Sequence, residues 1–144
     1  MHINIITTPL QLTIHGFGGI AVNHCYAHTA FELSGRMWQL IKAFNIPNKG
    51  KNIWVYESHH AVFAGVELEQ ENNVTILEKK TICLNKYAYY KHTGAYSLLK
   101  QTTQSIIQEL KASGYQVILP NIEIYGHWTN DESQLEKELL FALQ

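Results

Sequence analysis

The two halves of this sequence repeat one order of patterns, strand, helix, strand, strand, and this repeat limits the possible folds more than any other feature. In each half, a segment with strand composition precedes a helical stripe, and two more segments follow the stripe. The segments after the stripes echo each other weakly, as Val55-Tyr56-Glu57 and Ile124-Tyr125-Gly126. An internal repeat of this kind indicates a duplicated structural unit. We therefore expect two similar halves that meet at a central cleft.

The individual elements are expected from hydrophobic periodicity and composition. Leu10–His15 alternates apolar and polar residues, which is typical of a half-buried strand. Apolar residues recur along one helical face in residues 30–44 and again in residues 99–110. β-Branched and aromatic composition predicts the other strands at residues 53–56, 61–68, 74–84, 86–91 and 122–125. Residues 138–143 fit a strand or a helix, and the pattern does not decide between them.

Local signals predict where these elements begin and end. Thr29 to Glu32 fits a capping box, so the first helix is expected to begin at Thr29. Gly114 stands where the residue after the second helix should lie. A bulge or bend is expected in the first strand at three glycines, Gly16, Gly18 and Gly19. The polar run at residues 69–73 is the expected boundary, which gives one domain over 1–144 with pseudo-repeats at about 8–70 and 74–144.

Composition excludes several classes of protein. The chain has 144 residues, of which 46% are apolar and 16% charged, so it is long and apolar enough for a folded domain and is not intrinsically disordered. The 11 basic and 12 acidic side chains show no basic stripe, so no direct nucleic-acid binding is expected. Two cysteines make no disulfide framework, and neither a secretory signal nor a membrane-spanning segment is present in the sequence. We expect a cytoplasmic protein that does not associate with membranes.

Several short motifs resemble those of one known family. They are Tyr87–Tyr96 and Pro120–Tyr125 in the second half, and Met37-Trp38, Val55-Tyr56 and Phe63–Glu67 in the first half. In order and spacing, over residues 8–144, they resemble the gyrase-inhibitor-like (GyrI-like) small-molecule-binding domain. This domain is also the effector-binding domain of bacterial multidrug-responsive transcription regulators. Two departures are Ala95, where the family commonly has proline, and a final segment that lacks the family's proline.

The resemblance implies an α+β fold built from a duplicated β-α-β-β unit. The implied sheet is antiparallel and concave, with two helices on its outer face and a central cleft for hydrophobic, often cationic, molecules. It also implies that Glu123 lies at the floor of that cleft. No helix-turn-helix precedes residue 10, so we expect the chain to act without a DNA-binding part of its own.

Strand alternation gives the candidate site a physical basis. Glu123 and Tyr125 fall on one face of their predicted strand, and they face the cleft if Ile122 and Ile124 pack on the helices. The same rule places Trp54 and Tyr56 on one face of the corresponding strand in the first half. Under the duplication Trp54 corresponds to Glu123 and Tyr56 corresponds to Tyr125.

One acid would then face a wall of aromatic rings. A partly buried carboxylate without a partner is unfavourable, and a cationic ligand would supply that partner. A flat cation over an aromatic ring gains about 0.5–2 kcal/mol. The sequence therefore predicts hydrophobic, cationic ligands for this site.

Other aromatic residues are candidates for the same cleft. Tyr90 and His92 share one face of their strand, which is our choice for the cleft face. Trp38 lies beside the core stripe of the first helix, and core packing is the alternative to ligand contact. Trp128 follows a glycine in a loop, where it either forms a rim or covers the edge of the core. The full candidate ligand-binding set is Glu123, Tyr125, Trp54, Tyr56, Tyr90, His92, Trp38 and Trp128.

One cluster has the composition of a metal site. His24, Cys25 and His28 would share a helix face and could bind zinc. The expected helix begins after them, and no second pair of ligands stands out. We therefore expect neither a metal nor another cofactor.

Three classes of function remain open. The first is a binding protein for hydrophobic, cationic small molecules. The second is a hydrolase of electrophilic cyclopropane-type toxins, a class that some relatives of the family suggest. Glu123 would be its general base, and a tyrosine such as Tyr125 or Tyr90 its proton donor. The third is a protein partner or inhibitor of gyrase or of a transcription regulator.

Overall fold

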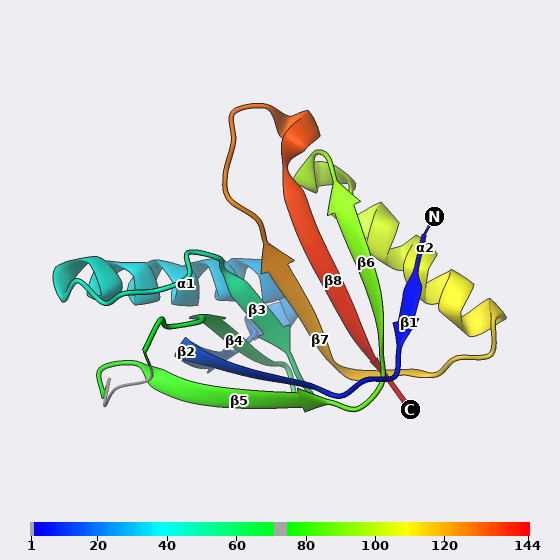
Figure 1. Cartoon of the computed structure of the whole chain (residues 1–144), viewed down its shortest axis with the longest axis horizontal. Coiled ribbons are helices and arrows are strands. Elements are labelled where there is room, and N and C mark those ends of the chain that lie inside the picture. The colour runs from blue at the N-terminus through cyan, green and yellow to red at the C-terminus, as the bar shows by residue number, and fades with distance from the viewer. Residues whose placement is uncertain (1, 71–74) are drawn as a thin grey trace.

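The part of the chain that the structure describes folds into an eight-stranded antiparallel sheet with two helices, as the α+β expectation required (Figure 1). The computed structural model describes residues 2–70 and 75–144. Its strands are β1 (Asn4–Ile6), β2 (Leu10–Ile20), β3 (Ile53–Tyr56), β4 (Ala61–Val66), β5 (Glu78–Leu84), β6 (Tyr87–Thr93), β7 (Val117–Tyr125) and β8 (Glu136–Leu143). Its helices are α1 (Tyr26–Ala43) and α2 (Leu99–Ala112), with 3-10 turns at Val22–His24, Tyr96–Leu98 and Glu132–Gln134. None of the helices in the described residues has the length and apolar character needed to cross a membrane.

The strand order reflects the duplication. It runs β1-β6-β8-β7-β3-β4-β2-β5, so that β7 and β3 pair at the centre and equivalent strands follow outward on both sides. The two edge strands are exchanged between the halves. β1 precedes β2 in the chain but pairs with β6, while β5 precedes β6 but pairs with β2. This exchange ties the two halves together through backbone hydrogen bonds, and the sequence analysis did not predict β1.

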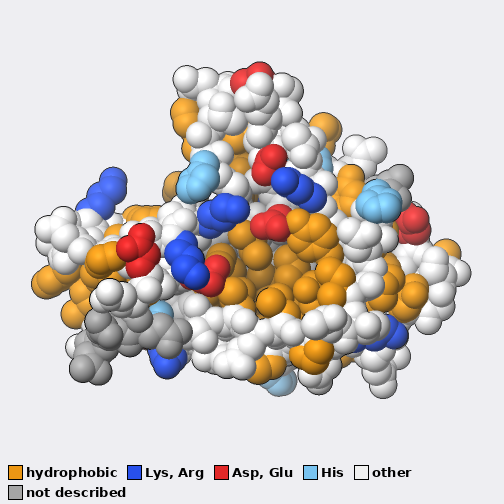
Figure 2. Space-filling view, viewed as in Figure 1, with side chains coloured by type: hydrophobic (Ala, Val, Ile, Leu, Met, Phe, Trp, Pro, Cys, Tyr) orange, Lys and Arg blue, Asp and Glu red, His pale blue; other side chains and the backbone are white. Residues whose placement is uncertain are grey.

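The two faces of the sheet carry different cores. On the face without helices, one cluster is centred on Ile14, Ile53, Val55, Ile122 and Leu140. This face is turned to the reader in Figure 2, where hydrophobic side chains gather at its centre. Ile122 and Ile124 both belong to this cluster, so they do not meet the condition, packing on the helices, under which Glu123 and Tyr125 were expected to face the cleft.

The helix-bearing face carries two cores, one in each half. α1 packs on β2 and β4 through Met37, Ile41 and Ala64, among others. α2 packs on β6 and β8 through Ile106, Leu110 and Leu139. Neither cluster contains a buried residue from the central strands β3 and β7. On this face, the central strands therefore lie between the core under α1 and the core under α2.

Two local expectations about the first half are wrong. α1 begins at Tyr26, and Thr29 lies inside it, where its hydroxyl donates to the Cys25 carbonyl at 3.0 Å instead of capping the helix. The glycines of β2 introduce no bulge, because the strand keeps a continuous register with β4 and with β5 through Gly16. Gly16 instead lets the backbones of β2 and β4 approach closely, while the nearest neighbours of Gly18 and Gly19 are the side chains of Phe63 and Leu33.

The second half follows the sequence more closely. The segment that the pattern left undecided is strand β8, and the segments expected at 74–84 and 86–91 contain the separate strands β5 and β6, with a bend at residues 85–86 between them. α2 ends beside Gly114, whose φ of 85° suits glycine. Of the boundary expected at residues 69–73, residues 71–73 lie outside the described residues, as does the expected start of a strand at Val74.

Candidate functional site

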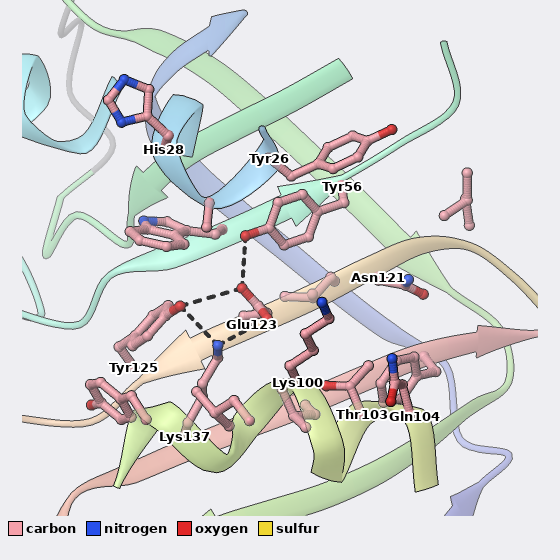
Figure 3. A pocket seen from close by; sticks show the side chains of 18 of the residues that line it. Tyr26, His28, Tyr56, Lys100, Thr103, Gln104, Asn121, Glu123, Tyr125 and Lys137 are labelled. Atoms are coloured by element: carbon pink, nitrogen blue, oxygen red, sulfur yellow. Dashed lines mark hydrogen bonds and ion pairs between the residues drawn. The ribbon is translucent and has the colours of Figure 1, made fainter. Parts of the chain in front are cut away.

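A large cleft lies on the helix-bearing face, above the central strands. Its volume is about 940 Å³, and Figure 3 shows how the strands form its floor and α2 one wall. The start of α1 forms the opposite wall. The lining includes Trp54 and Tyr56 from β3, Asn121, Glu123 and Tyr125 from β7, Lys137, Leu139 and Phe141 from β8, Tyr26 and His28 from α1, and Tyr96, Lys100, Thr103 and Gln104 at the start of α2.

The pseudo-twofold axis passes through the floor of the cleft. Trp54 is the direct cross-strand partner of Glu123. Tyr125 lies opposite Asn52, whose carbonyl accepts its backbone N–H at 2.9 Å, and Tyr56 lies opposite Asn121. This register has the expected correspondence of Trp54 with Glu123 and of Tyr56 with Tyr125. The full repeat is Asn-Ile-Trp-Val-Tyr at 52–56 and Asn-Ile-Glu-Ile-Tyr at 121–125, a longer signal than the one the sequence analysis used.

Glu123 has three partners within the protein. Its Oε1 accepts hydrogen bonds from the Tyr56 hydroxyl at 2.8 Å and from the Tyr125 hydroxyl at 3.4 Å. Its Oε2 lies 2.9 Å from Nζ of Lys137. Lys137 also donates to the Tyr125 hydroxyl at 2.8 Å, which closes a network of four side chains (Figure 3).

Lys137 overturns the expectation of a carboxylate without a partner. Its side chain is only 4% exposed, against 20% for that of Glu123, so the charge pair is largely withdrawn from water. The alternation of β8 could have revealed it, since Lys137 shares a face with Leu139 and Phe141. That rule could not be applied while residues 138–143 fitted a strand or a helix. The charge of the floor is thus balanced before any ligand binds.

Burial sets the protonation of the network. Burial, together with the nearby Glu123 charge, raises the pKa of the Tyr56 hydroxyl and that of the Tyr125 hydroxyl far above their usual value, so both remain donors at neutral pH. Burial lowers the pKa of the Lys137 ammonium, while the charge of Glu123 and its hydrogen bond act in the opposite direction. Glu123 therefore favours the charged state of Lys137.

Aromatic rings form the wall around this network. The ring centroids of Trp54 and Tyr125 are 4.6 Å apart, and Tyr96 meets Tyr125 edge to face at 5.3 Å. On the other side Tyr26 meets Tyr56 edge to face at 6.1 Å. These separations are within the range of favourable aromatic pairs. The rings support one another and offer a large, rigid apolar surface. Neither Tyr26 nor Tyr96 was named as a candidate from the sequence.

Two buried polar atoms on the lining have no hydrogen-bond partner in the described residues, Nε1 of Trp54 and Oδ1 of Asn121. The corresponding Asn52 in the first half is satisfied, because its Oδ1 accepts from Nε1 of Trp38 at 2.6 Å and from the Ser34 hydroxyl at 3.0 Å. The two equivalent asparagines therefore differ: the Oδ1 of Asn52 accepts two hydrogen bonds, whereas the Oδ1 of Asn121, which borders the cleft, accepts none from the described residues.

Four candidates from the sequence lie outside the cleft lining. Tyr90 and His92 lie on the helix-bearing face, as predicted, but α2 covers that part of the face. Tyr90 packs against the core under α2. His92 is buried, and its Nε2 lies 3.1 Å from the Ala95 carbonyl oxygen. Trp38 packs on the α1 core and bonds to Asn52. Trp128 is 74% exposed in the loop after β7. The structure thus brings together only Trp54, Tyr56, Glu123 and Tyr125 of the predicted set.

Trp38 has a role that a substitution can test. Changing Trp38 to phenylalanine removes the indole donor, but Asn52 keeps its bond from Ser34. We expect a loss of about 1 kcal/mol in the free energy of unfolding, typical of one hydrogen bond. Urea unfolding measures this loss, and ligand affinity should not change. A variant with native stability and weakened ligand binding would instead assign Trp38 to the site.

The histidines near the start of α1 border the cleft without forming a metal site. Cys25 and His28 line its mouth together with His24. His28 pairs with Glu32, and both side chains are exposed. Among residues 2–70 and 75–144, no group of three or more His, Cys, Asp or Glu side chains is arranged to hold a metal ion.

Comparisons with known proteins identify a family from the sequence and a shared fold from solved structures. The sequence profile of the GyrI-like small molecule binding domain matches residues 27–144. The structure of SAV2435 bound to tetraphenylphosphonium is 16% identical, with a TM-score of 0.67 over 100% of this chain and 94% of that one. The C-terminal domain of EcmrR is 14% identical, with a TM-score of 0.68 over 100% and 99% of the two chains. A hydrolase from Listeria innocua is 8% identical, with a TM-score of 0.60 over 99% and 91%. No curated protein matches the sequence.

Proposed function

Because the chain belongs to the GyrI-like small-molecule-binding domain family, we propose that its cleft captures hydrophobic, aromatic small molecules above a floor that contains Glu123. The observation that carries this proposal is the cavity of about 940 Å³ walled by Trp54, Tyr56 and Tyr125. A volume of this size is typical of sites for drug-sized compounds. Rigid aromatic walls give a large contact area with few side-chain rotations to restrict, which suits loose selectivity for shape.

The charge of the ligand is a separate question from its hydrophobicity. A cationic ligand was predicted because Glu123 was expected to lack a partner, and Lys137 removes that reason. SAV2435 binds tetraphenylphosphonium, a cation with four aromatic rings. The shared fold supports aromatic contact as the basis of binding here, and the charged groups of this chain must decide between cations, neutral compounds and anions.

A fluorescent ligand tests where binding occurs. N-Phenyl-1-naphthylamine is neutral, and its emission rises in an apolar site. Replacing Trp54 by leucine removes one aromatic wall without removing a hydrogen bond, since its Nε1 has no partner in the described residues. We expect this change to weaken binding about tenfold, as loss of a central aromatic contact does.

The matched control is Trp128→Leu, which makes the same chemical change at an exposed site outside the cleft lining. We expect this variant to bind the dye as the wild type does. If both variants bind normally, or if both are weakened equally, the cleft is not the binding site.

A second candidate function is hydrolysis of an electrophilic compound. The favouring observation is the Tyr56 hydroxyl, a second proton carrier 2.8 Å from Glu123. Glu123 would take a proton from a water molecule whose oxygen attacks the electrophilic carbon. Tyr56 or Tyr125 would donate a proton to the atom whose bond to that carbon breaks. Tyr90, the other donor named from the sequence, packs against α2 instead. Mass spectrometry of a cyclopropane electrophile should then show a product that has gained one water and that Glu123→Gln no longer forms.

A further inference from the structure

One charged side chain on the cleft lining differs from the rest. Lys100, the second residue of α2, extends from the helix into the cleft toward Glu123 and Asn121 (Figure 3). No ion pair or side-chain hydrogen bond joins it to any residue in 2–70 or 75–144. It is exposed to solvent, so its ammonium group remains accessible to a bound molecule.

The acidic groups of the lining already have cationic partners. Glu123 pairs with the buried Lys137. Glu57, the residue after β3, pairs with Lys80 of β5. When these pairs are set aside, the charge that the described lining presents to a ligand is the positive charge of Lys100. A cationic ligand would be repelled by Lys100 and would find the carboxylate of Glu123 already neutralised.

The surroundings of Lys100 suit an anion. Thr103 and Gln104 occupy the next turn of the same helix and also line the cleft (Figure 3). A hydroxyl and an amide nitrogen can both donate hydrogen bonds to a carboxylate. Hydrogen bonds that involve an ionised group are stronger than those between neutral groups. The cleft thus has an aromatic, charge-balanced part over the central strands and a donor-rich, positive part along α2.

We infer that the cleft selects aromatic compounds that carry one acidic group. The rings would rest against Trp54, Tyr56 and Tyr125, and the carboxylate or sulfonate would pair with Lys100. This inference rests on the proposed binding function and names the ligand class for the same site. It also reverses the charge that the sequence predicted.

Three compounds with one ring system separate charge from hydrophobicity: biphenyl-4-carboxylate, biphenyl-4-methanol and biphenyl-4-methylammonium. Calorimetric titration of the full chain at pH 7.5 measures all three. We expect the carboxylate to bind about tenfold more tightly than the alcohol, a modest effect for a charge-assisted hydrogen bond, and the ammonium to bind most weakly.

Two variants of Lys100 and one control complete the test. Lys100→Gln should bring the carboxylate to the affinity of the alcohol and leave the alcohol unchanged. Lys100→Glu should make the ammonium the tightest of the three. Lys111→Gln is the matched control, because Lys111 is an exposed residue of the same helix that does not line the cleft. All three variants lie on the surface of α2, so their circular dichroism should match that of the wild type.

The outcomes distinguish this inference from the function on which it rests. If the alcohol binds but the carboxylate binds no better, or if Lys100→Gln leaves the carboxylate unchanged, the selection for acids is overturned and hydrophobic capture stands. If the ammonium binds most tightly to the wild type, the selection is also overturned. If none of the three compounds binds or displaces N-phenyl-1-naphthylamine, the proposed function fails as well.

Discussion

Replacing Glu123 by leucine is expected to lower the free energy of unfolding by about 3–5 kcal/mol, the range for a buried ion pair that loses one partner. The loss arises because Lys137 stays buried, with a side chain only 4% exposed, after its carboxylate is gone. The Tyr56 and Tyr125 hydroxyls also lose their acceptor. An isolated buried ammonium is far less favourable than the same group in water.

A second substitution separates the charge effect from simple loss of packing. In the double variant Glu123→Leu with Lys137→Met, no unpaired charge remains, so most of the lost stability should return. Urea unfolding of the wild type, both single variants and the double variant closes a mutant cycle. A Glu123→Leu protein as stable as the wild type would contradict the prediction and show that Lys137 finds another partner or water.

The pH dependence of the Glu123→Leu variant gives an independent readout. Burial already lowers the pKa of Lys137, and Glu123 opposes that shift, so the pKa should fall further without Glu123. Between this lowered pKa and the ordinary lysine pKa of about 10.4, the unfolded chain then binds more protons than the folded protein. Stability rises with pH wherever the unfolded state binds more protons. The loss measured at pH 7 should therefore shrink as the pH rises toward 10.

Much of the sheet could be predicted because several of its strands have strong local patterns. Leu10–His15, Ile53–Tyr56 and Ile122–Tyr125 all lie in strands, as alternation and composition indicated. β1 was missed because three residues carry little pattern, and its pairing with β6 is set by a contact distant in the chain. The start of α1 was misplaced because Thr29 and Glu32 resemble a capping box. The helix begins before them, at Tyr26.

The candidate site was predicted where alternation and duplication agreed. Trp54, Tyr56, Glu123 and Tyr125 lie together because two equivalent strands pair at the axis. Which face of the sheet carries the helices was harder to predict, since β3 and β7 have apolar or aromatic residues on both sides. Lys137 was missed for a different reason. Its segment was left undecided between strand and helix, so the alternation that places Lys137 on the same face as Leu139 and Phe141 could not be applied.

Changing Gly16 to alanine is the second substitution with a large expected effect. Gly16 is buried opposite Gly65 in the pairing of β2 with β4. A Cβ added there would lie 1.8 Å from the carbonyl oxygen of Ala64 and 2.7 Å from the Cα of Gly65. Both are backbone atoms, so the two strands must move apart and the ladder between them must weaken. We expect a loss of about 3 kcal/mol or more, above the usual range for an added methyl group in a packed core.

Gly35→Ala makes the same chemical change with the opposite expected sign. Gly35 is an exposed residue within α1, and a Cβ added there would meet nothing within 4 Å. Alanine in a helix interior is more favourable than glycine by about 0.5–1 kcal/mol, because glycine loses more backbone freedom on folding. Thermal unfolding should thus place Gly16→Ala below the wild type and Gly35→Ala above it. Equal midpoints for Gly16→Ala and the wild type would mean that β2 and β4 tolerate a wider separation than their close backbone contact implies.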